Sequence, residues 1–326
     1  MALRVKWMVF WLIDLMAVLE FLLRRRRPKS GLTILCYHRT VGGLPQHPPF
    51  DPFNVSPATF CQQLAALRSL PGTTLTTAGE VAEWIERGSV RDGAYLMLTF
   101  DDGYQNVLEA ATQLHREGWP AVFFVATGYI GQPTFDFCAF DRWCTNQSDP
   151  RWYKPVTLDD CRRLLQLGME IQPHGHMHRR LGQLPQAEIE DEIRSSKAVV
   201  QEALGRKVIA FAYPYGSPYL KDFSRSVEGS LSEAGIQFAV STEIGRNDVR
   251  TLRLKSYQLR RIPVQEYDRG VFFQAKAAGY CALLRFVQAV IHKIKARRAV
   301  CGRALFATRE PGAKRDNLSS PPQALT

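Results

Sequence analysis

Apolar and polar residues alternate with two different periods along the middle of the chain. Between residues 32 and 264, short apolar or β-branched runs are followed by longer segments of helical period. The runs predict strands at 32–37, 95–100, 121–126, 169–172, 208–213, 238–241 and 258–263. The longer segments predict helices at 57–70, with Ser56 as its cap, and at 77–87, 105–117, 158–167, 186–204, 220–234 and 266–278. Repeated strand–helix units predict an α/β fold with a parallel sheet, and this many units favour closure into a barrel.

The N-terminal segment is apolar and ends in a basic run. Residues 7–23 contain two charges, Asp14 and Glu20. A spanning helix needs roughly 20 apolar residues, and a carboxylate near the bilayer centre costs about 2.5–3.5 kcal/mol, so spanning is marginal. The stretch also fits an interfacial helix or an amphipathic helix packed on the domain. The basic run at 24–29 predicts a domain on the cytoplasmic face; a periplasmic domain behind a signal anchor is the alternative.

The C-terminal segment is basic and amphipathic. Within residues 280–306, apolar positions 283, 287, 290, 291 and 294 share one helical face, with most cations off it. That pattern fits a membrane headgroup surface, and it also fits a helix that covers a barrel. Beyond residue 309 the composition predicts a disordered tail. The chain is therefore divided into 1–30 (hydrophobic helix and polybasic run), 31–278 (barrel), 279–308 (basic helix) and 309–326 (tail).

The formal net charge of +11 is concentrated at the two ends of the chain. Residues 1–30 carry seven Lys/Arg against two Asp/Glu, and residues 279–326 carry nine against two. Residues 31–278 carry 26 against 27, so the predicted barrel is close to neutral. A nucleic-acid-binding domain carries its basic patch on the folded body. We therefore expect no nucleic-acid partner, and we expect both basic ends to contact a membrane surface.

The cysteines indicate a reducing compartment. The chain has seven, an odd number, and they are scattered singly. A chain of this size can fold without disulfides. Cys138 and Cys144 are close in sequence, but no second pair completes a zinc site, and we interpret them as buried apolar residues.

Two adjacent carboxylates follow the predicted strand at 95–100. Asp101 and Asp102 stand at its carboxyl end, where parallel barrels place their reactive groups. Two such carboxylates cannot both be buried without a cation or a proton between them. One can bind a metal while its neighbour acts as a base. The alternative is an Asp-Asp-Gly turn at the surface.

Three histidines follow the predicted strand at 169–172. His174, His176 and His178 fall within five residues. The spacing of His174 and His178 lets both imidazoles converge on one point, and Asp102 would complete a three-ligand set. Three protein ligands and open positions are typical of a catalytic divalent metal site. His176 fits three roles equally: a group that supports the ligands, a general acid, or a solvated loop residue.

Two further strand ends carry candidate residues. Pro214 and Gly216 surround Tyr215 in a rigid turn, whose backbone N–H could face a developing oxyanion. The alternative is an ordinary turn between a strand and a helix. Tyr37 and His38 stand at the end of the first strand and could line the same pocket.

These motifs together resemble the polysaccharide deacetylase family, which comprises carbohydrate esterases with a NodB-like domain. The family's Thr-Phe-Asp-Asp-Gly motif stands unchanged at 99–103. Its His-Ser/Thr-x-x-His motif is similar to 174–178, with Gly175 in place of the hydroxyl residue, and its third motif corresponds to 212–216. The resemblance covers roughly residues 32–264 and implies a distorted (β/α) barrel.

The resemblance also implies the roles of individual residues. Asp101 would be the catalytic base, and Asp102, His174 and His178 would bind zinc, with cobalt or nickel as alternatives. Water would attack the amide carbonyl while the Tyr215 N–H helps to hold the oxyanion. The residues expected to line the substrate pocket are Tyr37, His38, Tyr104, Pro214 and Gly216.

The chain departs from the family in two places. Many members have an Arg in the third motif that orients the base, where this chain has Ala212. Many also end with Leu-x-His, whose His is the general acid, whereas residues 260–264 contain no histidine. The combination of Tyr37-His38 with the segments at 211–216 and 261–264 resembles a branch of the family tied to exopolysaccharide or surface-glycan synthesis. The proton donor is then His176, His38 or water.

These inferences predict a metal-dependent N-deacylase that removes acetyl or formyl groups from an amino sugar in a polysaccharide or lipid-linked glycan. Two other classes remain as alternatives. One is a catalytically silent glycan-binding protein that kept the metal pocket, and the other is a membrane scaffold whose barrel is only a platform. Neither alternative requires Asp101 beside a metal-binding carboxylate.

Overall fold

The computed structural model describes residues 15–42, 53–90, 92–137 and 152–307. The start of the predicted hydrophobic helix, the predicted tail, and Cys138 and Cys144, which we interpreted as buried, lie outside these residues. Cys36, Cys61, Cys161 and Cys281 are free thiols.

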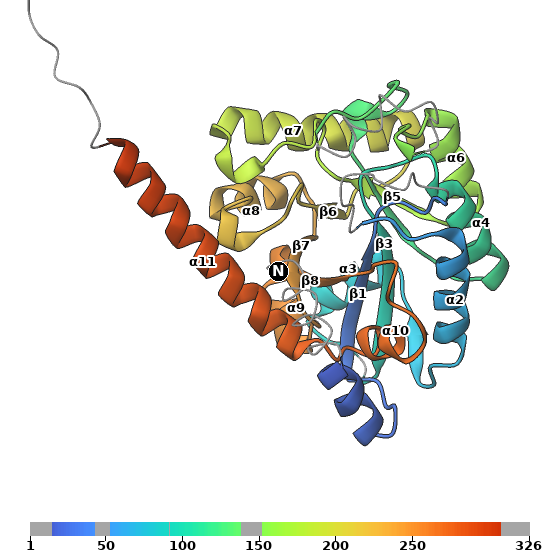
Figure 1. The fold of residues 1–326 in the computed structure, drawn as a ribbon. Coiled ribbons are helices and arrows are strands. Elements are labelled where there is room, and N and C mark those ends of the chain that lie inside the picture. Colours follow the sequence, from blue (N-terminus) through green and yellow to red (C-terminus); the bar gives the residue numbers. More distant parts are fainter. Residues whose placement is uncertain (1–14, 43–52, 91, 138–151, 308–326) are drawn as a thin grey trace, which may run out of the picture.

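Eight parallel strands form the sheet that the alternating pattern predicted (Figure 1). Their order is β5-β4-β3-β1-β8-β7-β6, and β2 pairs with β3 outside this path. The strands are β1 (Gly31–Tyr37), β2 (Thr73–Leu75), β3 (Ala94–Phe100), β4 (Val122–Val125), β5 (Glu170–Pro173), β6 (Ala210–Ala212), β7 (Phe238–Ile244) and β8 (Leu259–Pro263). The sheet curls into a nearly closed, distorted barrel, so the predicted fold class is confirmed.

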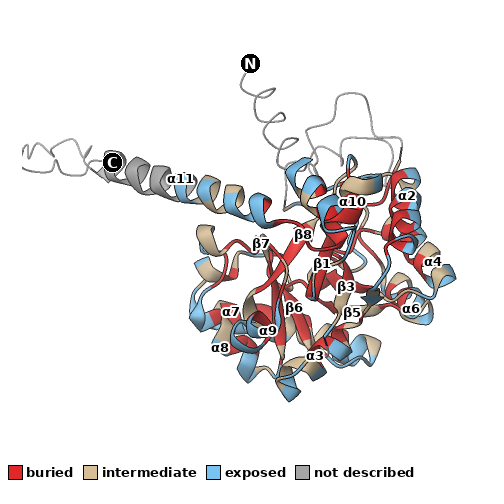
Figure 2. Ribbon diagram, turned by 90° about the horizontal axis from the view of Figure 1, so that it is seen from below, coloured by how far each residue is buried: buried red, intermediate tan, exposed pale blue. Residues whose placement is uncertain are grey.

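Helices surround this barrel (Figure 1). They are α2 (Pro57–Arg68), α3 (Ala78–Arg87), α4 (Val107–Glu117), α6 (Leu158–Gln166), α7 (Gln186–Ala198), α8 (Arg225–Glu233), α9 (Val249–Leu254), α10 (Gly270–Ala277) and α11 (Ala282–Ala307). Local chemistry sets several ends. The Ser56 side chain caps α2, and Thr77 and Glu80 form a capping box at α3. In Figure 2 the strands are buried, while the outer sides of the helices are exposed.

Side chains, rather than a backbone ladder, join β5 to β6 and complete the barrel. The Gln172 carbonyl oxygen accepts hydrogen bonds from Ile209 N and Ala210 N, at 3.0 Å each. Its amide nitrogen donates to Lys207 O at 3.2 Å. Two residues after Gln172, just beyond the end of β5, His174 Nδ1 lies 2.8 Å from Ala212 O. A buried glutamine side chain therefore takes the place of strand pairing at this seam.

The two terminal helices pack against the barrel. Residues 15–23 are helical, with Val18 and Phe21 buried. On α11, Leu284 is buried, and Gln288 bonds Ile244 N at 2.7 Å and Thr242 O at 2.7 Å. No helix among the described residues is long and apolar enough to cross a membrane.

Candidate metal and active site

A strained turn after β3 directs two carboxylates into the barrel. Asp101 N donates to Tyr37 O at 2.9 Å, which extends the β1–β3 ladder by one bond. Asp102 then adopts a φ of +74°, and Gly103 a φ of +90°. A Cβ on Gly103 would lie 2.8 Å from Val125 Cγ1, so only glycine fits. Asp101 and Asp102 are 2% and 6% exposed, which excludes the surface-turn alternative.

The histidine loop after β5 is held from below by a buried carboxylate. Glu192, on α7, accepts hydrogen bonds from His176 N at 2.8 Å and from Met177 N at 2.9 Å. Gly175 has a φ of +74°, and a Cβ there would lie 3.2 Å from Pro214 Cγ. The glycine is therefore needed for both conformation and space, and Glu192 supports a loop that no sequence motif connected to it.

Asp102, His174 and His178 form a buried triad that fits a divalent metal. Asp102 Oδ1 lies 3.3 Å from His174 Nε2 and 3.4 Å from His178 Nε2. Ligands on a tetrahedral zinc ion, at roughly 2.1 Å each, are about 3.4 Å apart. The contact of His174 Nδ1 with Ala212 O leaves Nε2 to face the metal, as is typical of metal-binding histidines. The three residues can therefore hold a metal ion.

Backbone strain gathers at this site. Asp102, His178 and Tyr215 have φ values of +74°, +51° and +62°, three of the six positive values at non-glycine residues in the described part of the chain. Such conformations cost of order 1–3 kcal/mol and persist where function requires them. The His178 ring is fixed by stacking on Phe137, with 3.8 Å between ring centroids.

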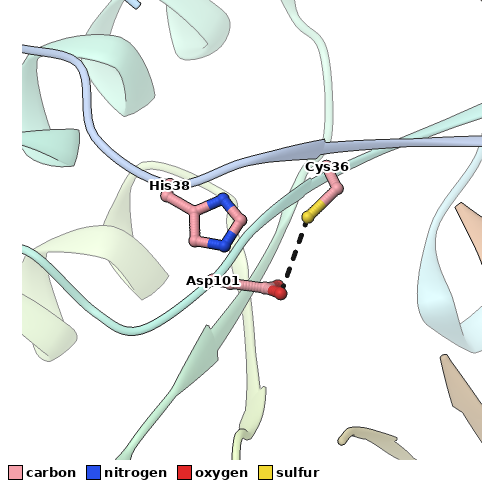
Figure 3. Close-up of side chains that lie close together, drawn as sticks. All are labelled: Cys36, His38 and Asp101. Atoms are coloured by element: carbon pink, nitrogen blue, oxygen red, sulfur yellow. Dashed lines mark hydrogen bonds between the residues drawn. The ribbon is translucent and has the colours of Figure 1, made fainter. Parts of the chain in front are cut away.

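Cys36, His38 and Asp101 lie close together (Figure 3), and all three line the same cavity as the metal triad. Their potential ligand atoms all lie within 4.8 Å of one another, and Cys36 Sγ lies 3.6 Å from Asp101 Oδ2. Successive residues of a strand point to opposite faces. Cys36 and His38 therefore face this space, while Tyr37 points into the core.

Arg261, on β8, forms a buried ion pair with Asp101. Its Nη1 donates to Asp101 Oδ1 at 2.6 Å, and its Nε donates to Ser241 O at 3.0 Å. The side chain is 1% exposed. Asp101 is thereby bonded to a cation on one side and left close to the metal triad on the other.

The charges of these groups favour a cation in the triad. Burial raises the pKa of Asp102, but hydrogen bonds from His174 and His178 outweigh it and hold the pKa well below its usual value. Burial also raises the pKa of Asp101, whereas Arg261 and His174 lower it, with a net decrease. Burial lowers the pKa of His174, but Asp101 and Asp102 raise it overall. Two ionised, buried carboxylates thus attract positive charge, which a metal ion would supply.

The triad and Asp101 open into a cavity of about 380 Å³. Its apolar walls include Phe53, Tyr104, Phe137 and Tyr215. Tyr215 is held in place by the Arg180 guanidinium, which lies 3.8 Å from the ring centre. Gln288 and His292 of α11 also line the cavity, so the C-terminal helix forms part of its wall.

The structure separates the sequence-predicted site residues into two groups. Asp101, Asp102, His174, His178, His38, Tyr104 and Tyr215 line the cavity. Four others do not. The Tyr37 ring stacks on Phe100 in the core, and His176 Nδ1 bonds Thr127 Oγ1 at 3.0 Å away from the cavity. Pro214 and Gly216 shape the turn around Tyr215 without lining the cavity.

The sequence of this region decides the family. Residues 89–239 match the sequence profile of the polysaccharide deacetylases, and this match spans both the Asp101 turn and the histidine loop. This part of the chain belongs to the polysaccharide deacetylase family. No curated protein matches the chain.

Solved structures share the fold of this chain. The Streptococcus pyogenes deacetylase PplD, in complex with acetate, is 21% identical with a TM-score of 0.59, over 74% of this chain and 96% of its own. IcaB from Ammonifex degensii is 22% identical with a TM-score of 0.60, over 77% and 97%. The BpsB deacetylase domain from Bordetella bronchiseptica is 17% identical with a TM-score of 0.55, over 72% and 95%.

Both departures of the chain from the family's motifs have a spatial counterpart. Ala212 lacks the arginine of the third motif, but Arg261 bonds Asp101 from β8. No histidine stands at 260–264, but His38 enters the cavity from β1. Two adjacent arginines, Arg260 and Arg261, within a predicted strand were the one sequence signal that could have pointed to Arg261.

Proposed function

We propose that the protein is a metal-dependent hydrolase that removes an N-acetyl or N-formyl group from an amino sugar in a polysaccharide or lipid-linked glycan. The observation that carries this proposal is a second buried carboxylate, Asp101, beside the triad and facing the same cavity. In a glycan-binding protein or a scaffold, an ionised, buried carboxylate at the position of Asp101 would have no chemical role.

The chemistry follows from the position of each group. A divalent ion, zinc in the first place and cobalt or nickel as alternatives, would polarise the amide carbonyl and activate water. Asp101, ionised and held by Arg261, accepts the proton of the attacking water. The Tyr215 N–H donates to the carbonyl oxygen as it gains charge.

His38 is the proton donor in this proposal. A ring nitrogen of His38 lies within 4.8 Å of a carboxylate oxygen of Asp101 on the cavity wall. The charges of both Asp101 and Asp102 act on the ring. Burial lowers its pKa, although Asp102 and Asp101 act in the opposite direction. A lowered pKa makes the imidazolium form of His38 a stronger acid toward the leaving amine, and the two nearby carboxylates favour that protonated form. His176 lies on the far side of its loop and has no such access.

The substrate class rests on the cavity. Its volume of about 380 Å³ and its aromatic walls suit a sugar ring, whose C–H faces pack on apolar surface. PplD and the BpsB domain are described as deacetylases, which supports an N-acyl amino sugar as substrate.

The test is release of acetate or formate from N-acylated glucosamine oligomers or a lipid-linked amino sugar, with zinc, cobalt or nickel bound. We expect release with at least one of these substrates. No release from any of them by metal-loaded protein contradicts the proposal. Tight oligosaccharide binding without turnover would indicate the silent glycan-binding protein. Vesicle binding that survives loss of His174 and His178, with no glycan ligand, would indicate the scaffold.

We also propose that the reaction takes place at the cytoplasmic face of a membrane. Support comes from the cations at 24–29 after the apolar stretch at 7–23. A phosphatase reporter, active only outside the cytoplasm, should be inactive when fused after the barrel. An active fusion would place the domain in the periplasm.

A further inference from the structure

Exposed apolar side chains are concentrated on the two terminal helices. Nine of the 16 large apolar residues exposed in the described part of the chain lie there. They are Leu15, Met16, Leu19, Leu22, Leu23, Leu283, Phe286, Val290 and Ile294. On α11 these positions follow a helical spacing along one face, while Leu284 and Gln288 pack on the barrel from the other. The outward face of each helix is therefore apolar.

Tyr280 joins the two helices at one corner of the barrel. Its ring packs edge-on against Phe21, with 5.4 Å between centroids, and its hydroxyl donates to Arg27 O at 2.8 Å. The Lys29 ammonium lies 4.3 Å from the centre of the same ring. Figure 1 shows the dark blue helix of residues 15–23 beside the orange start of α11. The outward apolar residues of both helices thus begin at this corner.

A basic hollow of about 600 Å³ lies at the same corner. Its charged wall residues are Arg24, Arg27, Lys29 and Arg246. Glu20 is ion-paired to Arg24 at 3.4 Å and to Lys29 at 2.9 Å. Neither Arg27 nor Arg246 forms an ion pair with a carboxylate in the described part of the chain. Glu20 beside Arg24 and Lys29 and Asp248 near Arg246 offset part of the charge, but the four wall cations leave an excess of positive charge that is complementary to a phosphate.

We propose that this hollow binds the phosphate of an anionic phospholipid while the apolar faces of residues 15–23 and α11 enter the headgroup layer. The combination identifies the ligand, because a free phosphate would need the cations but not the apolar residues around them. Interfacial helices with adjoining basic residues bind anionic membranes through both contributions. The site lies at the start of β1, whereas the catalytic cavity lies at its end, so the inference goes beyond the proposed reaction.

Co-sedimentation of the full-length protein with vesicles tests the proposal. We expect binding to mixed phosphatidylcholine–phosphatidylglycerol vesicles and little binding to phosphatidylcholine alone. Each cation near an anionic surface contributes roughly fivefold to affinity, so the double variant R27Q/R246Q should bind about 30-fold more weakly. The matched control R162Q/R194Q removes two exposed cations from α6 and α7 and should bind like the unmodified protein.

A second pair of variants tests the apolar contribution. Leu23 and Phe286 are 76% and 64% exposed, and Leu254 on α9 is 69% exposed. L23S and F286S should each weaken vesicle binding, and L254S should leave it unchanged. Melting temperatures measured for all variants identify any that fail to fold, and the readout is independent of turnover.

Three outcomes would overturn the proposal. The first is equal binding to neutral and anionic vesicles. The second is binding of inorganic phosphate that depends on Arg27 and Arg246, with no vesicle binding, which would make the hollow a free-phosphate site. The third is self-association that L23S and F286S abolish, with no vesicle binding, which would make the apolar faces a protein interface.

Discussion

The cavity in which we propose that the reaction takes place has two halves that are built differently. The metal half, Asp102, His174 and His178, comes from two strand-end turns, in which Asp102 and His178 adopt positive φ values. The acid–base half is assembled across β1, β3 and β8, which adjoin in the sheet although Arg261 and Asp101 are 160 residues apart. The metal half thus depends on the conformation of two loops, and the acid–base half depends on the order of the strands. Substitutions in the metal half should change metal binding, whereas substitutions in the acid–base half should change turnover with metal retained.

The largest effect is expected in the metal half. His174→Ala removes one of three ligands and should abolish stoichiometric metal binding, since the site depends on all three. Activity should fall by about 10³-fold or more, because the metal's charge stabilisation is worth several kcal/mol. Metal content by mass spectrometry of the purified protein and acetate release check both. Retained metal with full activity would contradict the triad.

Asp101→Asn should separate the halves most clearly. The variant keeps the shape of the side chain and leaves the triad intact, so metal content should be unchanged. Loss of the base should lower kcat by about 10²–10⁴-fold. Parallel metal analysis and kinetics on one preparation measure this. Activity close to that of the unmodified enzyme would remove Asp101 from the role of base.

His38→Gln tests whether His38 or His176, the other histidine predicted from the sequence, donates the proton to the leaving amine. We expect a fall in kcat of about 10²-fold with metal retained, because the leaving amine loses its donor. The matched variant His176→Gln, which changes the same residue type outside the cavity, should stay within about threefold. The reverse order of effects would reassign the donor to His176.

Arg261→Met should have the smallest effect on the maximal rate but a distinct effect on pH dependence. Arg261 lowers the pKa of Asp101, so its removal raises that pKa. The base must be ionised to work, and the acidic limb of kcat/KM therefore moves to higher pH. At pH values above the new limb, much of the rate should return. An unmoved limb would contradict the assigned contact, and Arg261→Lys should restore part of the shift.

Much of the metal half was accessible from the sequence. Asp102, His174 and His178 stand in short motifs at predicted strand ends, beside Gly103 and Gly175, which have positive φ values. The same holds for the helices that begin at Ser56 and Thr77, whose caps are local. The three-residue strand β2 was missed because it is too short to show a period.

The acid–base half was accessible only in part. Nothing near Arg261 or Cys36 in the chain indicates that they meet Asp101, because that contact follows from β1 lying between β3 and β8. Glu192 and Gln172 likewise act on partners that lie in other segments. The predicted helix at 220–234 begins at Arg225, since Ser224 caps it there. Long-range pairing of this kind has no signature in a single sequence.

The seam between β5 and β6 couples barrel closure to the metal site. Gln172 on β5 and His174 just after it both form hydrogen bonds across the seam. The contact of His174 also orients its ring toward the metal, so closure of the seam and orientation of this ligand depend on each other. Thermodynamic reciprocity then requires a bound metal to stabilise the seam as much as the closed seam improves metal affinity. The backbone N–H groups of Ile209 and Ala210 donate to Gln172 and not to the triad. Their protons should nevertheless exchange with solvent more slowly when metal is bound. A bound metal should therefore stabilise the barrel wall at this seam, and the metal-free protein should open there first.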